Sequence, residues 1–352
     1  MTRRRLHPRA VGPDELRAGF DAVRRELEVP TSFPPAADAA AAAAAPRGPA
    51  DLGARLDARD LDFVTLDPLG SMDLDQAFHL ARRDGGGWRV RYAIADVAAF
   101  VAPGDPVDAE AWVRGSTRYA PDGRAPLHPP VLSEGAASLL PDQDRPAALW
   151  TVDLGADGER TAVDLRRAWV RSRAQLDYVG AQHAVDDGTA TGALALLTEV
   201  GTARAAAIRR RGGFDLPLPD QEVVPAGDGW TLELRGPLPV ERHNAQLSLL
   251  CGLAAADLML GLGVGLLRTL PPPDPAALER LRAVAQGLGV AWPADVALGD
   301  VLDGLDSSEP AAAAFVEETT TLLRGAAYVA FDGAPPEQAV HGAIGAPYAH
   351  VT

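Results

Sequence analysis

The sequence contains no lysine and only one cysteine, and these absences exclude several classes of protein. All 33 basic residues are arginine, so a phosphate-binding G-x-x-x-x-G-K-[ST] loop cannot exist. The lone Cys251 rules out an intramolecular disulfide and a cysteine-based zinc cluster, and it favours a reducing, cytoplasmic location. The chain also lacks a G-x-S-x-G elbow and an H-E-x-x-H pair, which argues against a serine hydrolase and a zinc hydrolase.

Charge and hydrophobicity limit the surfaces that the chain can interact with. The net charge of −15 over 352 residues argues against a surface that coats nucleic acid, although a locally positive channel or bound metal ions remain compatible with it. The N-terminal arginines precede no apolar segment, so we predict no secretory signal. The longest apolar run, residues 245–267, is interrupted by Asp257 and glycines, which predicts a buried core helix rather than a membrane span.

The most informative stretch runs from Asp62 to Leu80. An apolar run at residues 63–66 has the composition of a buried strand, and Asp67 follows it directly. A turn at residues 68–71 then leads to Asp73 and Asp75, which are two residues apart and can share one face of an extended segment. Three converging carboxylates repel one another unless a cation lies between them, so we predict a Mg²⁺ site. The alternative is a solvated acidic turn.

The same stretch resembles the catalytic motif of the ribonuclease II (RNB) family, which is roughly D-P-x4-D-x-D-D-A. The matching residues run from Asp67 through Asp73 and Asp75 to Ala77. The resemblance implies that Asp67, Asp73 and Asp75 are catalytic metal ligands. Gln76 stands where the family has a fourth aspartate. Its amide oxygen can coordinate a metal but carries no charge, so we expect Gln76 to be a weak or indirect ligand.

Three further matches imply substrate-binding residues. Tyr119 lies in a segment similar to the family's T-x-Y-x-P, whose tyrosine stacks on a base, and Tyr178 lies in a similar L-x-Y. Glu241 stands where a family glutamate opens the long apolar helix at the substrate channel. Ordinary packing for the tyrosines and solvent exposure at a helix start for Glu241 are the alternatives.

The predicted fold is α+β. We expect a mostly antiparallel sheet or barrel-like core from about residue 60 to 235, with helices packed around a central apolar helix at 241–267. Residues 1–50 would form an N-terminal helix and an Ala/Pro-rich linker, and residues 51–352 an RNB-like catalytic domain. In the family, the run at residues 348–352 leads into S-P-I-R-R, so we expect this domain to be C-terminally incomplete.

The resemblance implies a 3′-to-5′ exoribonuclease that hydrolyses single-stranded RNA to nucleoside 5′-monophosphates with Mg²⁺. Neither a membrane nor an organic cofactor is expected, and activity would be impaired if the catalytic domain is incomplete. Two alternatives remain open. One is a catalytically inactive RNA-binding or regulatory protein, which Gln76 favours, and the other is a different metal-dependent phosphoesterase.

Overall fold

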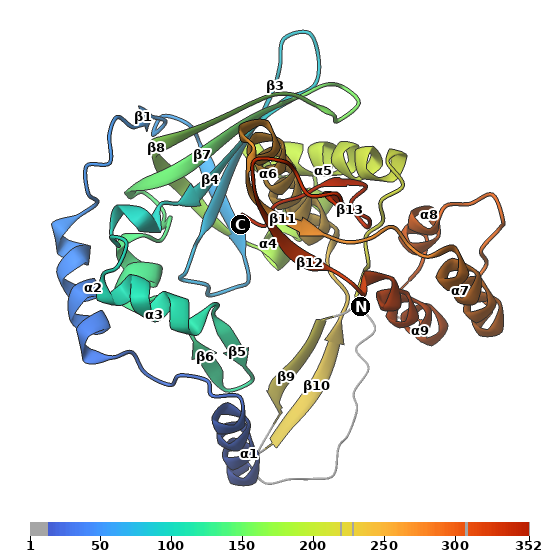
Figure 1. Cartoon of the computed structure of the whole chain (residues 1–352), viewed down its shortest axis with the longest axis horizontal. Helices are drawn as coiled ribbons and strands as arrows, with labels where there is room; N and C mark the ends of the chain where they lie inside the picture. Colours follow the sequence, from blue (N-terminus) through green and yellow to red (C-terminus); the bar gives the residue numbers. More distant parts are fainter. Residues whose placement is uncertain (1–12, 219, 227–228, 307–308, 352) are drawn as a thin grey trace.

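A six-stranded sheet that closes on itself forms the core of the protein (Figure 1). The computed structural model describes residues 13–218, 220–226, 229–306 and 309–351. The strand order is β1-β8-β2-β3-β4-β7, and β7 also pairs with β8. The pairings of β8 with β1 and β2 are parallel and the others are antiparallel, so the predicted mostly antiparallel, barrel-like core is confirmed. These strands are β1 (Leu56–Asp57), β2 (Phe63–Asp67), β3 (Gln76–Arg82), β4 (Trp88–Ala95), β7 (Asp144–Leu154) and β8 (Arg160–Asp177).

The long strand β8 closes the barrel because it changes partner along its length. Its first part pairs with β7 as far as Arg171, and from Ser172 to Asp177 it pairs with β2. Buried side chains alternate along β4, where Trp88, Val90 and Tyr92 face the core. The result places the C-terminal end of β2 beside the C-terminal end of β8.

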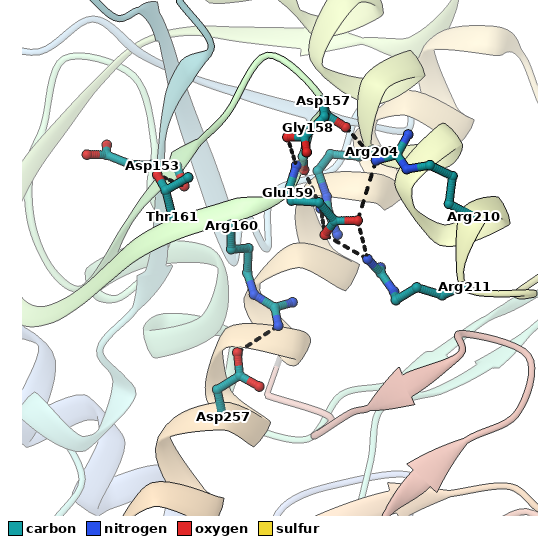
Figure 2. Close-up of polar contacts among 10 residues, drawn as sticks. All are labelled: Asp153, Asp157, Gly158, Glu159, Arg160, Thr161, Arg204, Arg210, Arg211 and Asp257. Atoms are coloured by element: carbon teal, nitrogen blue, oxygen red, sulfur yellow. Dashed lines mark hydrogen bonds and ion pairs between the residues drawn. The ribbon is translucent and has the colours of Figure 1, made fainter.

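The tip of the β7–β8 hairpin is fixed to helix α5 (Gly192–Arg210) by arginines (Figure 2). The fully buried Arg204 donates to the carbonyl oxygen of Gly158 at 2.5 Å. Arg211 donates to both carboxylate oxygens of Glu159 at 2.8 Å. Gly158 has a φ of +78°, and a Cβ there would lie 2.5 Å from the carbonyl oxygen of Ala203. The close approach of the hairpin to α5 therefore requires glycine at this position.

The central apolar helix α6 (Pro239–Leu262) is shorter than predicted. It buries Leu247, Leu250 and Leu253, but it ends at Gly263, which adopts the left-handed conformation. Strand β11 (Val264–Thr269) follows and pairs with β12 (Ala327–Asp332), so the prediction of helix to residue 267 was wrong. Within the described residues, α6 is the one helix long and apolar enough to cross a membrane, and half of its most apolar window is buried inside the fold.

The N-terminal helices lie at the edge of the molecule, at the left and the bottom of Figure 1. Helix α1 (Pro13–Glu26) agrees with the predicted helix, and the alanine-rich stretch forms helix α2 (Pro35–Arg47). Ala41 of α2 is fully buried and packs in a cluster with Phe100 and Leu132. The remaining elements are α3 (Pro106–Arg114), β5 (Arg118–Ala120), β6 (Gly123–Ala125), α4 (Tyr178–Asp186), β9 (Asp220–Ala226), β10 (Gly229–Arg235), α7 (Pro275–Leu288), α8 (Leu298–Asp303), α9 (Pro310–Thr319), β13 (Val340–His341), β14 (Ala346–Pro347) and the short turns Val97–Ala99, Leu132–Ala136 and Thr320–Leu323.

Candidate metal and substrate site

Asp67 is held in place because it ends a strand inside the sheet. It is the last residue of β2 and lies opposite Asp177 of β8. The chain then turns through Pro68, whose carbonyl oxygen accepts a hydrogen bond from the Ser71 amide at 3.1 Å. Gly70 adopts a φ of +85° in this turn, a conformation that glycine adopts without steric cost. The predicted strand–turn arrangement is therefore present.

Leu74 anchors the segment between Asp73 and Asp75. Its side chain is fully buried, and its amide donates to Ser138 Oγ at 3.0 Å. The Leu74 carbonyl oxygen accepts a hydrogen bond from the Leu139 amide at 2.9 Å. Since neighbouring side chains of an extended segment point in opposite directions, burial of Leu74 turns both aspartates away from the core.

The carboxylates of this motif repel one another. The pKa of Asp67 is raised to about 6 by burial and by the nearby charges of Asp75 and Asp73. The pKa of Asp75 is raised to about 6 by desolvation and by Asp73. Asp67 Oδ2 is also buried without a hydrogen-bond partner among the described residues. A cation between Asp67 and Asp75 would relieve both the repulsion and the missing contact.

Gln76 separates two adjoining cavities. A cavity of about 60 Å³ is lined by Asp67, Tyr178 and Asn244 together with Gln76. A second of about 200 Å³ is lined by Asp73 and Asp75, again with Gln76. Gln76 Oε1 accepts a hydrogen bond from the Tyr92 hydroxyl at 2.6 Å, so one of its two lone pairs is already used. Gln76 therefore lies at the site, but its side-chain oxygen already accepts a hydrogen bond from the protein.

Arg124 contacts the acidic motif and was not predicted from the sequence. It lies on β6 and donates to Asp73 Oδ2 at 2.9 Å and to Glu134 Oε1 at 2.7 Å. The carboxylate of Asp73 is thereby partly neutralised, unlike that of Asp67. In the described part of the chain, no group of three or more His, Cys, Asp or Glu side chains is gathered as a metal cluster. Arg124 is 51 residues from Asp73, and no local pattern links the two.

The donor set fits Mg²⁺. Carboxylate oxygens are the ligands that this ion uses together with water and substrate phosphate. Asp67 offers a buried oxygen that has no partner among the described residues, and burial together with repulsion from the neighbouring aspartates raises the pKa values of Asp67 and Asp75. Asp67 and Asp75 therefore fit best as direct ligands, whereas Asp73 shares its charge with Arg124.

Tyr178 and Glu241 lie near the Asp67 side of the site. Tyr178 begins α4 and lines the cavity with Asp67, and burial followed by the charge of Asp67 raises its pKa. Glu241 is in the first turn of α6 and forms an ion pair with Arg235 at 2.5 Å. Asn244, which sequence reasoning did not identify, lines the same cavity and donates to the Leu66 carbonyl oxygen at 3.4 Å.

Tyr119 lies farther out, on the exposed hairpin β5–β6. Its side chain is 74% exposed, so ordinary core packing does not account for it. The pKa of Tyr119 is raised by desolvation and by the charge of Asp73. A surface groove of about 660 Å³ runs between this hairpin and α1, and its lining includes Tyr119, Phe20 and Leu27.

Most of the chain is similar in sequence to one family of known proteins. Residues 55–352 match the RNB domain family. Over 313 residues, the chain is 30% identical to "Exosome complex exonuclease RRP44 homolog A" of Arabidopsis thaliana, which covers 85% of this chain and 33% of that relative. Over 164 residues it is 36% identical to "Ribonuclease R" of Escherichia coli K12, which covers 46% of this chain and 20% of that relative.

Solved structures share the fold. Mycoplasma genitalium RNase R in complex with ribose methylated single-stranded RNA superposes with a TM-score of 0.79 at 21% identity, covering 95% of this chain and 54% of that one. Yeast Ssd1, described as a pseudonuclease, gives a TM-score of 0.68 at 16% identity, covering 87% of this chain and 39% of that one. The chain thus spans from a fifth to about half of the length of these proteins.

Proposed function

This chain belongs to the RNB domain family, and from this premise we propose that it is a 3′-to-5′ exoribonuclease. It would hydrolyse single-stranded RNA to nucleoside 5′-monophosphates with Mg²⁺ as cofactor, in the cytoplasm. The observation that carries the proposal is the pair Asp67 and Asp75. The pKa values of both carboxyl groups are raised, and Asp67 also has a buried oxygen without a partner among the described residues. Hydrolysis of a phosphodiester is the chemistry that such a site supports.

Each predicted site residue has a specific task in this proposal. Asp67 and Asp75 would hold Mg²⁺ directly, Asp73 would contribute a carboxylate that also accepts from Arg124, and Gln76 would be at most an indirect ligand because Tyr92 donates to its oxygen. Bound Mg²⁺ supplies charge that activates water and stabilises the leaving oxygen. Arg124 fixes the direction of the Asp73 carboxylate, which a charge-assisted hydrogen bond does well.

Two tyrosines would bind the substrate. Tyr178 lies beside Asp67, where the 3′-terminal nucleotide must sit for its phosphodiester bond to reach the acids. Tyr119 is exposed on β5 and is free to stack on a base farther along the strand. Stacking accepts every base, so degradation would be independent of RNA sequence. Glu241, which is ion-paired with Arg235, would hold the start of α6 in position beside the bound RNA.

A hydrolysis assay tests the proposal. We would incubate 5′-labelled single-stranded RNA with the protein, with Mg²⁺ or with chelator, and separate the products on a gel. A ladder shortening from the 3′ end that appears only with Mg²⁺ is the expected result. Asp75→Asn should lower the rate at least 100-fold while retaining RNA binding, measured separately by fluorescence anisotropy. Hydrolysis by Asp75→Asn at the wild-type rate would contradict the assignment of the site.

A second candidate, an RNA-binding protein without catalysis, is favoured by one observation. The oxygen of Gln76 accepts a hydrogen bond from Tyr92, and Gln76 stands where the catalytic motif of the family has an acid. If RNA binds in the anisotropy measurement but no ladder forms at any Mg²⁺ concentration, this second function is correct. Release of phosphate from small phosphodiesters without RNA hydrolysis would instead indicate another phosphoesterase.

A further inference from the structure

A cavity of about 300 Å³ lies on the face of α6 that points away from the acidic motif. It is enclosed by α5, α6, α8 and residues 343–344. Asn244 of α6 contacts the backbone next to Asp67, whereas Gln246 lines this cavity. Because Asn244 and Gln246 are two residues apart, their side chains are rotated by about 200° around the helix and point to opposite faces. Helix α6 therefore separates the cavity from the acidic motif.

Two residues that line the cavity carry buried polar atoms without a hydrogen-bond partner among the described residues. Gln246 is 5% exposed, and within the described chain its Oε1 has no hydrogen-bond donor. Beside it, His243 Nδ1 is also buried and unpaired with any described residue. Burial and the neighbouring Arg242 lower the pKa of His243, so the imidazole is neutral near pH 7. A buried carbonyl acceptor without a donor is unfavourable, and a bound donor would remove this cost.

The walls and the rim restrict the ligand further. Ile208, Phe214 and Ile344 are buried apolar residues that line the cavity, and they suit a flat ring. At the rim, Asp303 bridges Arg209 and Arg242, with Oδ1 accepting from Arg242 Nη2 at 2.6 Å.

The rim does not favour an anion. Asp215 lies 3.7 Å from Arg242, and Asp300 lies 3.7 Å from Arg209. With Asp303, three carboxylates therefore face two guanidinium groups.

We propose that this cavity binds a nucleobase, carried by a free nucleoside. A base offers a ring or amino N–H to Gln246 Oε1, a second polar atom to His243 Nδ1 and flat faces to the apolar walls. The cavity is at the small end of the usual range of about 300–1,000 Å³ for ligand sites, which suits one base. The choice of a nucleobase among planar heterocycles rests on the proposed function, whose products carry one.

The isoleucines of the chain provide a direct test. There are three, at positions 94, 208 and 344. Ile208 and Ile344 line this cavity, while Ile94 lines the cavity of Asp73 and Asp75. We would label isoleucine methyl groups with ¹³C, assign them with Ile208→Val and Ile344→Val, and titrate adenosine, cytidine, guanosine and uridine in chelator. The expected result is a saturable shift of Ile208 and Ile344 by at least one nucleoside, without a shift of Ile94.

Matched variants make the test specific. Gln246→Leu should weaken binding about tenfold by removing the acceptor, and Ala205→Leu should abolish it by filling the cavity. Gln286→Leu makes the same exchange at an exposed position of α7 and should bind as wild type does. An unchanged Ile94 signal in each variant shows that the fold is intact.

Three results would overturn the proposal. They are the absence of a shift with all four nucleosides at millimolar concentration, a shift confined to Ile94, and equal binding by Gln246→Leu and wild type. Inorganic phosphate alone should not shift Ile208 or Ile344, since the rim carries more carboxylates than guanidinium groups. Saturable nucleoside binding at this cavity without RNA hydrolysis would refute the proposed exoribonuclease and leave the nucleobase site in place. RNA hydrolysis without nucleoside binding would refute the nucleobase site and leave the exoribonuclease in place.

Discussion

Gln76 shows how one side chain links the acidic motif to the sheet. Its oxygen accepts a hydrogen bond from Tyr92, a buried residue of β4, and its side chain lines the cavities on both sides of it. An aspartate would be one methylene shorter and would add a negative charge next to Asp75. The amide therefore keeps a neutral contact with the core at a position where a further charge would repel Asp67 and Asp75 in the metal-free protein.

Replacing Gln76 tests whether this amide limits metal affinity. Gln76→Asp should lower the Mg²⁺ concentration that gives half-maximal RNA hydrolysis or half-maximal thermal stabilisation, by about tenfold, because one more carboxylate faces the ion. Tyr92→Phe is the matched control, since it removes the hydrogen bond without adding charge and should change the half-maximal concentration much less. A higher Mg²⁺ requirement in Gln76→Asp than in wild type would show that the amide oxygen is the better ligand.

Asp67 should make the metal-free protein less stable as pH rises. Its pKa increases from an ordinary 3.8 to about 6 in the folded state, so the folded state binds the proton more tightly than the unfolded state does. The protonated form is fully favoured below about pH 4, and this stabilisation is lost as pH rises through about 6. The pKa of Asp75 is raised in the same direction, but Asp75 is exposed whereas Asp67 is half-buried, so we base the magnitude on Asp67.

Thermal unfolding in chelator checks this pH dependence. At pH 7.5, Asp67→Asn should unfold with a free energy about 1 kcal/mol higher than wild type, because it removes a buried charge that lacks a partner. At pH 4 the two proteins should be equally stable. Mg²⁺ should stabilise wild type and not the variant. A variant less stable than wild type at pH 7.5 in chelator would show that the Asp67 carboxylate has a stabilising contact without metal.

At the scale of elements, the β7–β8 hairpin is held on α5 by one carboxylate among several arginines (Figure 2). Glu159 accepts hydrogen bonds from Arg210 and Arg211 and lies 3.9 Å from the buried Arg204. Burial and the neighbouring charge of Arg160 lower the pKa of Arg204 to about 10. Glu159 therefore offsets a repulsion that would otherwise separate the hairpin from the helix.

Removing this carboxylate should weaken the contact between hairpin and helix. Glu159→Gln is expected to lower the free energy of unfolding by about 2 kcal/mol, since Arg204 stays buried with less compensation. Asp257→Asn is the matched control because it breaks the more exposed Arg160–Asp257 pair and should cost at most about 1 kcal/mol. Urea denaturation at pH 7 measures both values. Equal effects would show that Glu159 acts as an ordinary surface ion pair.

At the scale of the whole molecule, the net charge of −15 limits how the proposed RNA substrate can bind. A strongly acidic surface repels the phosphate backbone beyond the site itself. Under the proposed function, affinity would then come from stacking on Tyr119 and Tyr178 and from bound Mg²⁺ rather than from many arginine–phosphate contacts. The protein should therefore have little affinity for nucleic acid that does not present a free single-stranded end.

The salt dependence of RNA binding tests this view. Using Asp75→Asn to prevent hydrolysis, the slope of log affinity against log salt concentration should be about −2, which corresponds to roughly three phosphate contacts. Arg124→Gln should leave this slope unchanged, because Arg124 is engaged by Asp73 and Glu134. A slope steeper than about −5 would mean that RNA contacts an extended basic channel and that the net charge does not predict how RNA binds.

The sequence by itself determined which residues form the acidic motif and how they are spaced. Strand periodicity placed Asp67 at the end of β2, and two-residue spacing placed Asp73 and Asp75 on one face, because both effects depend on neighbouring residues alone. The same local signals predicted the long helix, although they placed the helix end beyond Gly263, after which β11 begins and pairs with the distant β12.

Only the tertiary structure decided which groups meet the motif from elsewhere in the chain. Arg124 contacts Asp73, Tyr92 donates to Gln76, and Asn244 reaches the backbone next to Asp67. The partner change of β8, which closes the barrel, and the cavity behind α6 likewise depend on residues far apart in sequence. Such contacts arise when elements pack together, and no local pattern of residues records them.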